Sequence, residues 1–470
     1  MGNATRLVRP RTVTGDGEGL VSRGGLLWLG EAADRSGLTT GLSQVLAGVP
    51  RRRHDPGVGL AQLVVALADG AECLSDLDAL RGQPQLFGPV LSRSSAQRAF
   101  EALGPAELRR LAGARRNARA VAWEAGAGPD SDEATIDLDA TIVRTKADKE
   151  DAAPTHKHTY GHHPHLAMLA ETGEVLAGMF RPGNAGANNA ADHVVVLAAA
   201  IDQLPDVWQA GHLAGDDPAA ATRKLLVRTD SAGASHWFAQ ECRDRNLGFS
   251  LGYWIDGRVR DALLLVQEED WEPAREAGGR VRDGAQVAEI TALVNLDAWP
   301  TGTRLIVRRE RPHPGAQLSL FDTIEGLRHT AFITDTPEQD LDLAALDLRH
   351  RRRGRAEQII RDTKACGLAR LPFDGAANND RWMQLTFTAN DLLCWARRIS
   401  LIGPLRRATP KTIRHRLLHI AAHTSPRRLR LDATWPWTND LLDARDRLKT
   451  RLKTPPPHTV PIRPAIHPGL

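Results

Sequence analysis

The chain has 470 residues, a hydrophobic fraction of 42% and a formal net charge of +4. Its length leaves room for more than one packed unit, and its apolar content excludes an intrinsically disordered protein. The four cysteines contain no Cys-x-x-Cys pair, which argues against a disulfide framework or a cysteine zinc site. The N-terminus has no apolar signal segment and no apolar run reaches about 18 residues, so we expect a cytoplasmic protein rather than a secreted or membrane protein.

Residues 1–124 are predicted to be helical after a short extended start. One helix is indicated by apolar residues at the i, i+3, i+4 and i+7 spacing, namely Leu60, Leu63, Val64 and Leu67. Arginines accompany the later helices, and short helices with arginines are typical of helix-turn-helix-like DNA readers, although small helical bundles serve many other purposes. We therefore predict a helical DNA-binding region, followed by a linker over residues 125–133, where Gly, Ala and Asp dominate.

Beyond the linker the pattern changes to alternating strands and helices. In chain order we predict three strands, a helix, a strand, a helix and a strand, at residues 135–143, 165–170, 174–180, 188–204, 224–227, 234–245 and 249–254. This order belongs to the α/β class and describes a ribonuclease-H-like core. We assign that core to residues 134–257 and 346–400.

A predicted β-rich insertion, residues 258–345, interrupts the core, with strands expected at residues 287–296, 304–309 and 329–334. After the core resumes, a long helix is expected at 380–399. A basic helical C-terminal region over 401–454 and a Pro-rich tail over 455–470 follow. Residues 392–431 contain ten Arg or Lys and no acid. Such a block favours a polyanionic partner, usually nucleic acid, over a merely soluble face.

Carboxylates occur at unusual strand positions. Asp137, Asp139 and Thr141 point to the same face of a predicted core strand, where acids are disfavoured unless they have a function. Asp230 follows the strand at 224–227 and precedes a glycine turn. Sites in open α/β sheets form outside the carboxyl ends of strands, which is where Asp230 is expected, although Asp at a strand end is also a common turn or cap residue.

A basic segment with one glutamate opens the second part of the core. At about 100° per residue, five of its polar residues fall within an arc of about 80° on one helix face, namely His350, Arg353, Glu357, Arg361 and Lys364. For an isolated helix the simplest interpretation of Glu357 is an ion pair with the arginine four residues later. Together with an acid of the first strand and Asp230, however, Glu357 completes three carboxylates. Three suffice to hold two Mg²⁺ or Mn²⁺ ions for attack at a phosphodiester.

These motifs resemble those of the DDE transposases of bacterial insertion sequences. The family's Y-x2-R-x3-E-x6-K signature is matched, with every spacing kept and His in place of Tyr, by His350, Arg353, Glu357 and Lys364. Asp139-Ala140-Thr141 is similar to the family's D-x-T on the first strand, and Asp230 to its second Asp. The sequence segments around these motifs look most like the insertion sequence 1380 family, namely DLDATIV, AAPTHKHTYGHHPHLA, RPGNA and RTDSAG. The resemblance covers nearly the whole chain.

The resemblance implies a role for each of these residues. Asp139, Asp230 and Glu357 would be the catalytic ligands of two Mg²⁺ or Mn²⁺ ions. Asp137 is a second candidate, as a ligand itself or as support for one. The residues expected to contact the DNA phosphates that flank the scissile bond are Arg353 and Lys364, with Arg361 and His350 as further candidates.

Two further features have a functional and an ordinary interpretation. The histidines between residues 156 and 165 could bind zinc, but they lack Cys partners and helical spacing. We favour a strand entry near the active site, with Lys157 and His158 touching DNA. Trp299, in a Trp-Pro-Thr-Gly turn, could stack on an unpaired DNA base or be buried within the insertion.

The function that these observations predict is that of a DNA transposase. It would bind the terminal inverted repeats of an insertion sequence, cleave at the ends and join the freed 3′-hydroxyls to target DNA. Its partners would be double-stranded DNA, as transposon ends and as target, and a second copy of itself at synapsis, with no membrane and no small-molecule substrate. The alternatives are a metal-dependent nuclease of the same fold, an inactive DNA-binding relative and a histidine-rich zinc regulator.

Overall fold

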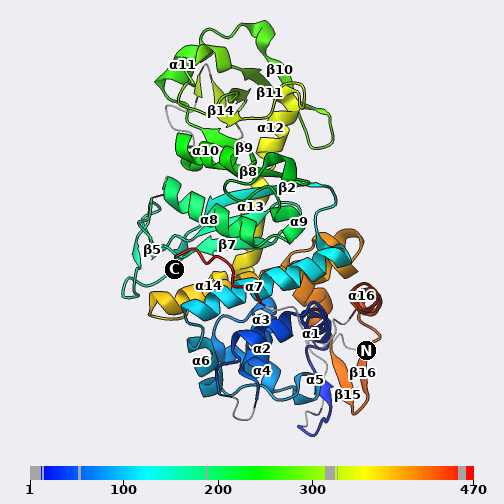
Figure 1. Ribbon diagram of the computed structural model, residues 1–470. Coiled ribbons are helices and arrows are strands. Elements are labelled where there is room, and N and C mark those ends of the chain that lie inside the picture. The colour runs from blue at the N-terminus through cyan, green and yellow to red at the C-terminus, as the bar shows by residue number, and fades with distance from the viewer. Residues whose placement is uncertain are drawn as a thin grey trace, which may run out of the picture.

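The computed structural model (Figure 1) describes residues 12, 15–50, 54–186, 189–312, 323–324, 326–453 and 462–469. The chain folds as a mixed α/β structure with one large mixed sheet and many helices. None of the described helices has the length and apolar character that a bilayer crossing requires.

The N-terminal region is helical, as predicted. Its helices are α1 (Leu26–Arg35), α2 (Leu38–Val45), α3 (Pro56–Ala68), α4 (Asp78–Arg81), α5 (Pro84–Phe87), α6 (Arg93–Glu101) and α7 (Pro105–Ala122). Helix α3 contains the predicted apolar stripe and has Pro56 in its first turn. Its start is fixed by Asp55, whose carboxylate accepts hydrogen bonds from the backbone N–H groups of Gly57 and Val58. The predicted extended start lies mostly outside the described residues, apart from β1 (Leu20–Val21).

The five predicted core strands lie side by side in the large sheet. They are β2 (Glu133–Ala140), β6 (His165–Leu169), β7 (Val175–Met179), β8 (Lys224–Thr229) and β9 (Gly248–Tyr253). Their order in space is β7-β6-β2-β8-β9. Strand β2 is parallel to β8, and β8 to β9, whereas β6 is antiparallel to both β2 and β7. The strand with the two acids therefore lies in the middle of this part of the sheet.

Helices cover both faces of these strands. The described helices after the linker are α8 (Ala190–Asp202), α9 (Asp206–Gln209), α10 (His236–Asp244), α11 (Gly257–Leu263), α12 (Leu343–Arg351), α13 (Gly354–Thr363), α14 (Ala376–Ser400), α15 (Pro410–Ile413) and α16 (Thr438–Arg451). Of these, α12 packs on the insertion strands and α16 on α14 and α1. Ile136 and Leu138 pack with α8 and α10 on one face, and Leu166 packs with α13 and α14 on the other. Because Asp139 lies opposite Leu166 in the ladder, Asp139 and Asp137 project from the face that α13 covers.

The predicted insertion lengthens the same sheet. Its strands are β10 (Glu272–Arg275), β11 (Val281–Glu289), β12 (Arg304–Glu310), β13 (Thr323–Ile324) and β14 (Leu327–Thr334). Strand β14 pairs with β9, and the remaining strands continue from it toward the top of Figure 1. The strand expected at 287–296 lies earlier, because the chain turns at Thr291–Leu293. The domain boundaries themselves stay a prediction.

The basic segment is not one continuous helix, and that part of the prediction was wrong. Helix α12 ends at Arg351 and α13 begins at Gly354. Between them the backbone N–H of Arg353 donates to the carbonyl of His350, a tight i to i−3 bond that turns the chain. Glycine after this turn disfavours continuation of the first helix. A single helical arc therefore does not describe the residues from His350 to Lys364.

The C-terminal region, predicted to be helical, also contains a hairpin. Strands β15 (Ala422–Ser425) and β16 (Arg428–Leu431) form it, and β1 pairs with β15 to complete a small three-stranded sheet. Of the predicted Pro-rich tail, residues 455–461 lie outside the described residues. Residues 462–469 lie along α7, where the backbone N–H of Ala465 donates to the carbonyl of Arg109.

Buried ion pairs join α7 to the rest of the molecule. Arg115 and Arg119 contact the Asp391 carboxylate of α14 at 2.8 and 2.7 Å, and Arg119 also contacts Glu174, just before β7, at 2.7 Å. These four side chains are at most 2% exposed. The indole of Trp395 also donates to Glu174, at 2.6 Å. Helices α7 and α14 and the β6–β7 hairpin are therefore one packed unit.

Candidate active site

Asp139 lies at the carboxyl end of β2, and its side chain is 16% exposed. Its Oδ1 accepts a hydrogen bond from the backbone N–H of Ala140 at 2.8 Å. Burial raises the pKa of Asp139 to about 6, an effect that Arg353 opposes and the negative charge of Asp230 reinforces. A carboxylate in this state is stabilised by any additional cation that comes near it.

Asp230 follows β8 directly, as predicted, and also caps a short turn. Its Oδ1 accepts from the backbone N–H of Ala232 at 3.0 Å, and the side chain is 46% exposed. Strand β9 presses close to this turn at Gly252, where a Cβ atom would lie 2.5 Å from the backbone N of Ser231. Only glycine lets the neighbouring strand approach the Asp230 turn so closely.

Arg353 brings the two acids together. One guanidinium nitrogen contacts Asp139 Oδ2 at 3.0 Å and Asp230 Oδ2 at 3.4 Å. Because β2 and β8 are parallel neighbours, both acids stand at the same edge of the sheet. Two carboxylates from separate strands thus lie within reach of a single cation.

Asp137 has a different environment. Its two carboxylate oxygens accept from Nε and a terminal nitrogen of Arg228 at 2.8 and 2.9 Å, in a bidentate pair that is almost fully buried. Arg228 also donates to the carbonyl of Arg349 in α12. Asp137 therefore has its charge matched and links β2, β8 and α12. An arginine inside an apolar strand, Arg228, was the sequence signal that could have predicted a buried ion pair for Asp137.

Glu357 lies in the first turn of α13, and its side chain is exposed. Between the described residues, no hydrogen bond or ion pair joins it to either aspartate. Likewise, within the described part of the chain, no three His, Cys, Asp or Glu side chains are grouped closely enough to hold a metal ion. The structure thus brings two of the three predicted ligands together and leaves the third on an adjacent helix.

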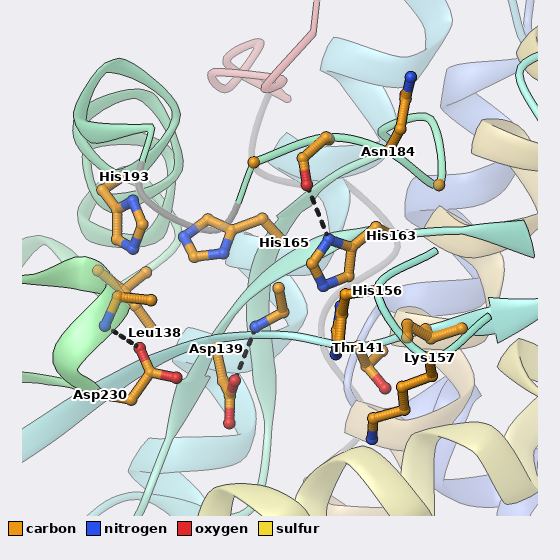
Figure 2. Close-up of a pocket in the computed structure, with 16 residues that line it drawn as sticks. Leu138, Asp139, Thr141, His156, Lys157, His163, His165, Asn184, His193 and Asp230 are labelled. Atoms are coloured by element: carbon orange, nitrogen blue, oxygen red, sulfur yellow. Dashed lines mark hydrogen bonds between the residues drawn. The ribbon is translucent and has the colours of Figure 1, made fainter. Parts of the chain in front are cut away.

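A polar cavity of about 540 Å³ opens beside the two aspartates (Figure 2). Its wall contains four histidines and a lysine, namely His156, His163, His165, His193 and Lys157. His165 is 2% exposed, and within the described part of the chain neither of its ring nitrogens has a hydrogen-bond partner. Burial holds the pKa of His165 well below its usual range, and the nearby His193 lowers it further. Three histidines of the run between residues 156 and 165 thus line the cavity, whereas His158 and His162 do not. His193 from α8 is an addition that spacing did not suggest.

The predicted phosphate contacts have varied surroundings. The Lys364 ammonium donates to the carbonyl of Ile142 at 2.9 Å, just beyond β2. Burial lowers the pKa of Lys364, and the positive charge of Lys157 lowers it further. Arg361 is exposed and donates to Gln358 at 2.8 Å. Lys364 and Lys157 therefore belong to the site, whereas Arg361 is held along its own helix.

His350 and Trp299 are engaged in packing. The ring of His350 stacks on Phe332 with 4.4 Å between centroids, and its Nδ1 is 2.9 Å from the Ser250 hydroxyl. Burial, with Arg353 close by, lowers the pKa of His350 to about 3. The half-buried Trp299 packs edge-on against His236, with 4.5 Å between ring centroids. Neither residue lines the cavity.

The chain was compared with protein families, curated proteins and solved structures. A family model described as "Transposase DDE domain group 1" matches residues 6–453. The solved piggyBac transposase synaptic complex with hairpin DNA is a distant structural match, with a TM-score of 0.42 and 10% identity over 94% of this chain and 87% of that chain. No curated protein matches the chain.

Proposed function

The chain belongs to the transposase family described as DDE domain group 1, and on this basis we propose that it cleaves and joins DNA as an insertion-sequence transposase. It would bind the terminal inverted repeats of its element, cleave at the ends and join the freed 3′-hydroxyls to target DNA. The observation that carries the proposal is the meeting of Asp139 and Asp230 at Arg353, beside a polar cavity. Synapsis of two ends requires at least two copies of the chain.

The proposed catalytic core is ribonuclease-H-like. It consists of β7, β6, β2, β8 and β9 with helices on both faces. Two observations support the assignment: this strand order, and the antiparallel β6 beside the three parallel strands β2, β8 and β9. The acids follow the carboxyl ends of two parallel neighbours, where sites of open α/β sheets form. The sequence around the motifs further supports a bacterial cytoplasmic protein of the insertion sequence 1380 family.

Asp139, Asp230 and Glu357 are the proposed ligands of two Mg²⁺ or Mn²⁺ ions, and domains of this family generally depend on divalent metals. Carboxylate oxygens are the donors that these ions prefer. The donor set fits a cation, because Asp139 and Asp230 already share one in Arg353. When bound, the metal ions would activate the attacking oxygen and neutralise charge on the scissile phosphate. Glu357, in the first turn of α13, would complete the ligand set with the two aspartates.

The basic residues around the two aspartates would hold the DNA. Arg353 is 21% exposed and shared between two acids, so it would exchange a carboxylate for a phosphate oxygen. Lys364 is held at the carboxyl end of β2 by its bond to Ile142, and Lys157 lines the cavity. Two amines and a guanidinium beside the acids would orient the scissile phosphate without contributing a base. Asp137, fixed by Arg228, would position β2 rather than bind metal.

The test uses a plasmid that carries the coding sequence with its native flanking DNA. The wild-type protein should cut at the element's ends with Mg²⁺ or Mn²⁺ and not with EDTA. Asp139→Asn, Asp230→Asn and Glu357→Gln should each reduce cleavage by about 10³-fold or more. Asp297→Asn, which changes an exposed acid of the insertion, is the matched control and should cut normally.

Two results would change the assignment. Unaltered cleavage by any of the three variants would remove that residue from the ligand set. Cleavage without joined products would favour the metal-dependent nuclease of the same fold over a transposase.

A further inference from the structure

One face of the β15–β16 hairpin is basic and open to solvent. Its register pairs His423 with Arg430 and Ser425 with Arg428, so these side chains share a face, and Arg427 lies in the connecting turn. All five residues are exposed. The alternate residues are buried or half-buried against the molecule. We call the exposed set of His423, Arg427, Arg428 and Arg430 the basic ribbon.

The arginines of the basic ribbon differ from several other cations of the basic block. Arg397 donates to the carbonyl of Ala408, Arg398 to that of Ala127 and Arg414 to that of Ala365. These bonds hold separate segments of the chain together. For Arg427, Arg428 and Arg430, in contrast, no side-chain hydrogen bond or ion pair occurs with any other residue that the structure describes. Arg407, Lys411 and Arg416 likewise have no side-chain hydrogen bond or ion pair with a described residue, but only on the hairpin do three such arginines lie within four consecutive residues.

The hairpin is mounted rigidly. At its base, Leu431 packs on the main hydrophobic cluster, and Ala422 is buried. The indole of Trp435 donates to the carbonyl of Arg416 at 2.8 Å and packs on Trp437, with 5.3 Å between ring centroids. The nearest acid along the chain, Asp432, is occupied by hydrogen bonds from Thr434. A fixed backbone lowers the entropy that the arginines lose when they bind a partner.

We propose that the basic ribbon docks in the major groove of double-stranded DNA. The groove, about 12 Å wide, admits a two-stranded β-ribbon. The hairpin is two-stranded toward its turn, beyond β1, which pairs only with Ala422 and His423. Arginine is the side chain best suited to phosphates and to guanine edges. The hairpin lies among the N-terminal helices, away from β2 and β8 in Figure 1. The inference rests on the proposed function and deepens it, because it names the segment that would hold element DNA away from the point of cleavage.

The experiment measures binding of a 40-base-pair duplex of arbitrary sequence at several salt concentrations. The double variant R428E/R430E should bind at least about tenfold more weakly, and neutralisation in R428A/R430A should reduce the salt slope by about 2. The same duplex, treated with dimethyl sulfate, should show protection of guanine N7 in the major groove by the wild type and not by the variant.

Control variants make the result specific to the hairpin. R280E/R370E carries the same charge change on exposed arginines of the β10–β11 turn and of the segment after α13, and it should bind as the wild type does. R427E changes only the turn of the hairpin. If the double variant melts at a lower temperature than the wild type, R427E replaces it in the binding measurement.

The outcomes of this experiment separate the two proposals. Wild-type affinity and salt slope in both ribbon variants would overturn the ribbon while leaving end cleavage intact. Loss of duplex binding in these variants supports the ribbon even if the wild type cleaves no DNA, in which case the transposase proposal fails alone. A loss confined to single-stranded 40-mers would also overturn the major-groove assignment.

Discussion

Arginine and carboxylate side chains meet in two regions of this molecule with different results. Between α7 and α14, Arg115 and Arg119 surround Asp391 in a site closed to water. At the carboxyl end of β2, Arg353 is shared by two acids, of which Asp230 is 46% exposed. The first region is closed, with matched charge, whereas in the second two acids share one guanidinium beside a cavity. The same residue types thus stabilise the fold in one place and leave negative charge available for a ligand in the other.

Breaking the closed region should have the largest effect on stability. Asp391→Ala leaves Arg115 and Arg119 buried without their shared partner, so the free energy of unfolding in urea should fall by about 3–5 kcal/mol. Asp130→Ala is the matched control, because this carboxylate is 77% exposed and its two arginine contacts should contribute less than about 1 kcal/mol. Similar losses in both variants would remove the distinction between closed and open pairs.

In the open region, removing an acid should stabilise the fold rather than weaken it, and the gain should depend on pH. The pKa of Asp139 is about 6 in the fold and about 3.9 in the unfolded chain. The fold therefore loses stability as pH rises from about 4 to about 6, by at most about 3 kcal/mol. Asp139→Asn removes this term, so the variant should gain stability relative to the wild type over that window in EDTA. Mg²⁺ should reduce the gain. A pH-independent difference would contradict the raised pKa of the buried Asp139 carboxyl.

A glycine substitution tests whether backbone placement keeps the acids together. In Gly252→Ala the new Cβ would lie 2.7 Å from the Asp230 carbonyl carbon, so the turn after β8 must shift. We expect a loss of about 1–3 kcal/mol in unfolding free energy and weaker stabilisation by Mn²⁺ in thermal melting. Gly257→Ala, where the Cβ meets no atom within 4 Å, should change neither quantity. Normal Mn²⁺ stabilisation in Gly252→Ala would show that the acids tolerate displacement.

The smallest effect is expected at His350. His350→Phe keeps the stack on Phe332 and loses the hydrogen bond to Ser250. At pH 8, where the histidine is neutral in both the folded and the unfolded chain, unfolding free energy should fall by about 1 kcal/mol. His350→Tyr, the residue usual in the family, should cleave DNA within tenfold of the wild type. A loss of cleavage in the Phe variant comparable to that of Asp139→Asn would give His350 a direct catalytic role.

The sequence predicted elements whose signal is local. Alternating apolar residues located β2, a short apolar run located β8, and a strand end followed by glycine located the turn of Asp230. The proximity of Asp139 and Asp230 followed from strand order, because the carboxyl ends of neighbouring parallel strands lie at the same edge of a sheet. The long helix expected at 380–399 is α14, slightly extended at its N-terminal end.

The remaining features depend on contacts that spacing does not encode. The break before Gly354 is a backbone turn within a segment of good helical periodicity. Strands β15 and β16 have four residues each. The alternation of so few residues does not distinguish a strand from a helix. Asp137 and Asp139 are equivalent by strand alternation. The D-x-T resemblance favours Asp139, and the structure separates the two by the contact of Asp137 with Arg228. His193 joins the cavity because α8 packs across the sheet beside His165.

Helix α14 has a consequence for how the chain is made. From Trp382 to Ser400 nearly every side chain is buried, against α1, α3 and α7 among others. About 250 residues separate the end of α7 from the start of α14. At roughly 5–20 residues per second the ribosome needs about 13 to 50 s to synthesise that stretch. During this time the N-terminal helices lack their central partner, so the nascent chain displays apolar surface and is a substrate for chaperones until α14 emerges.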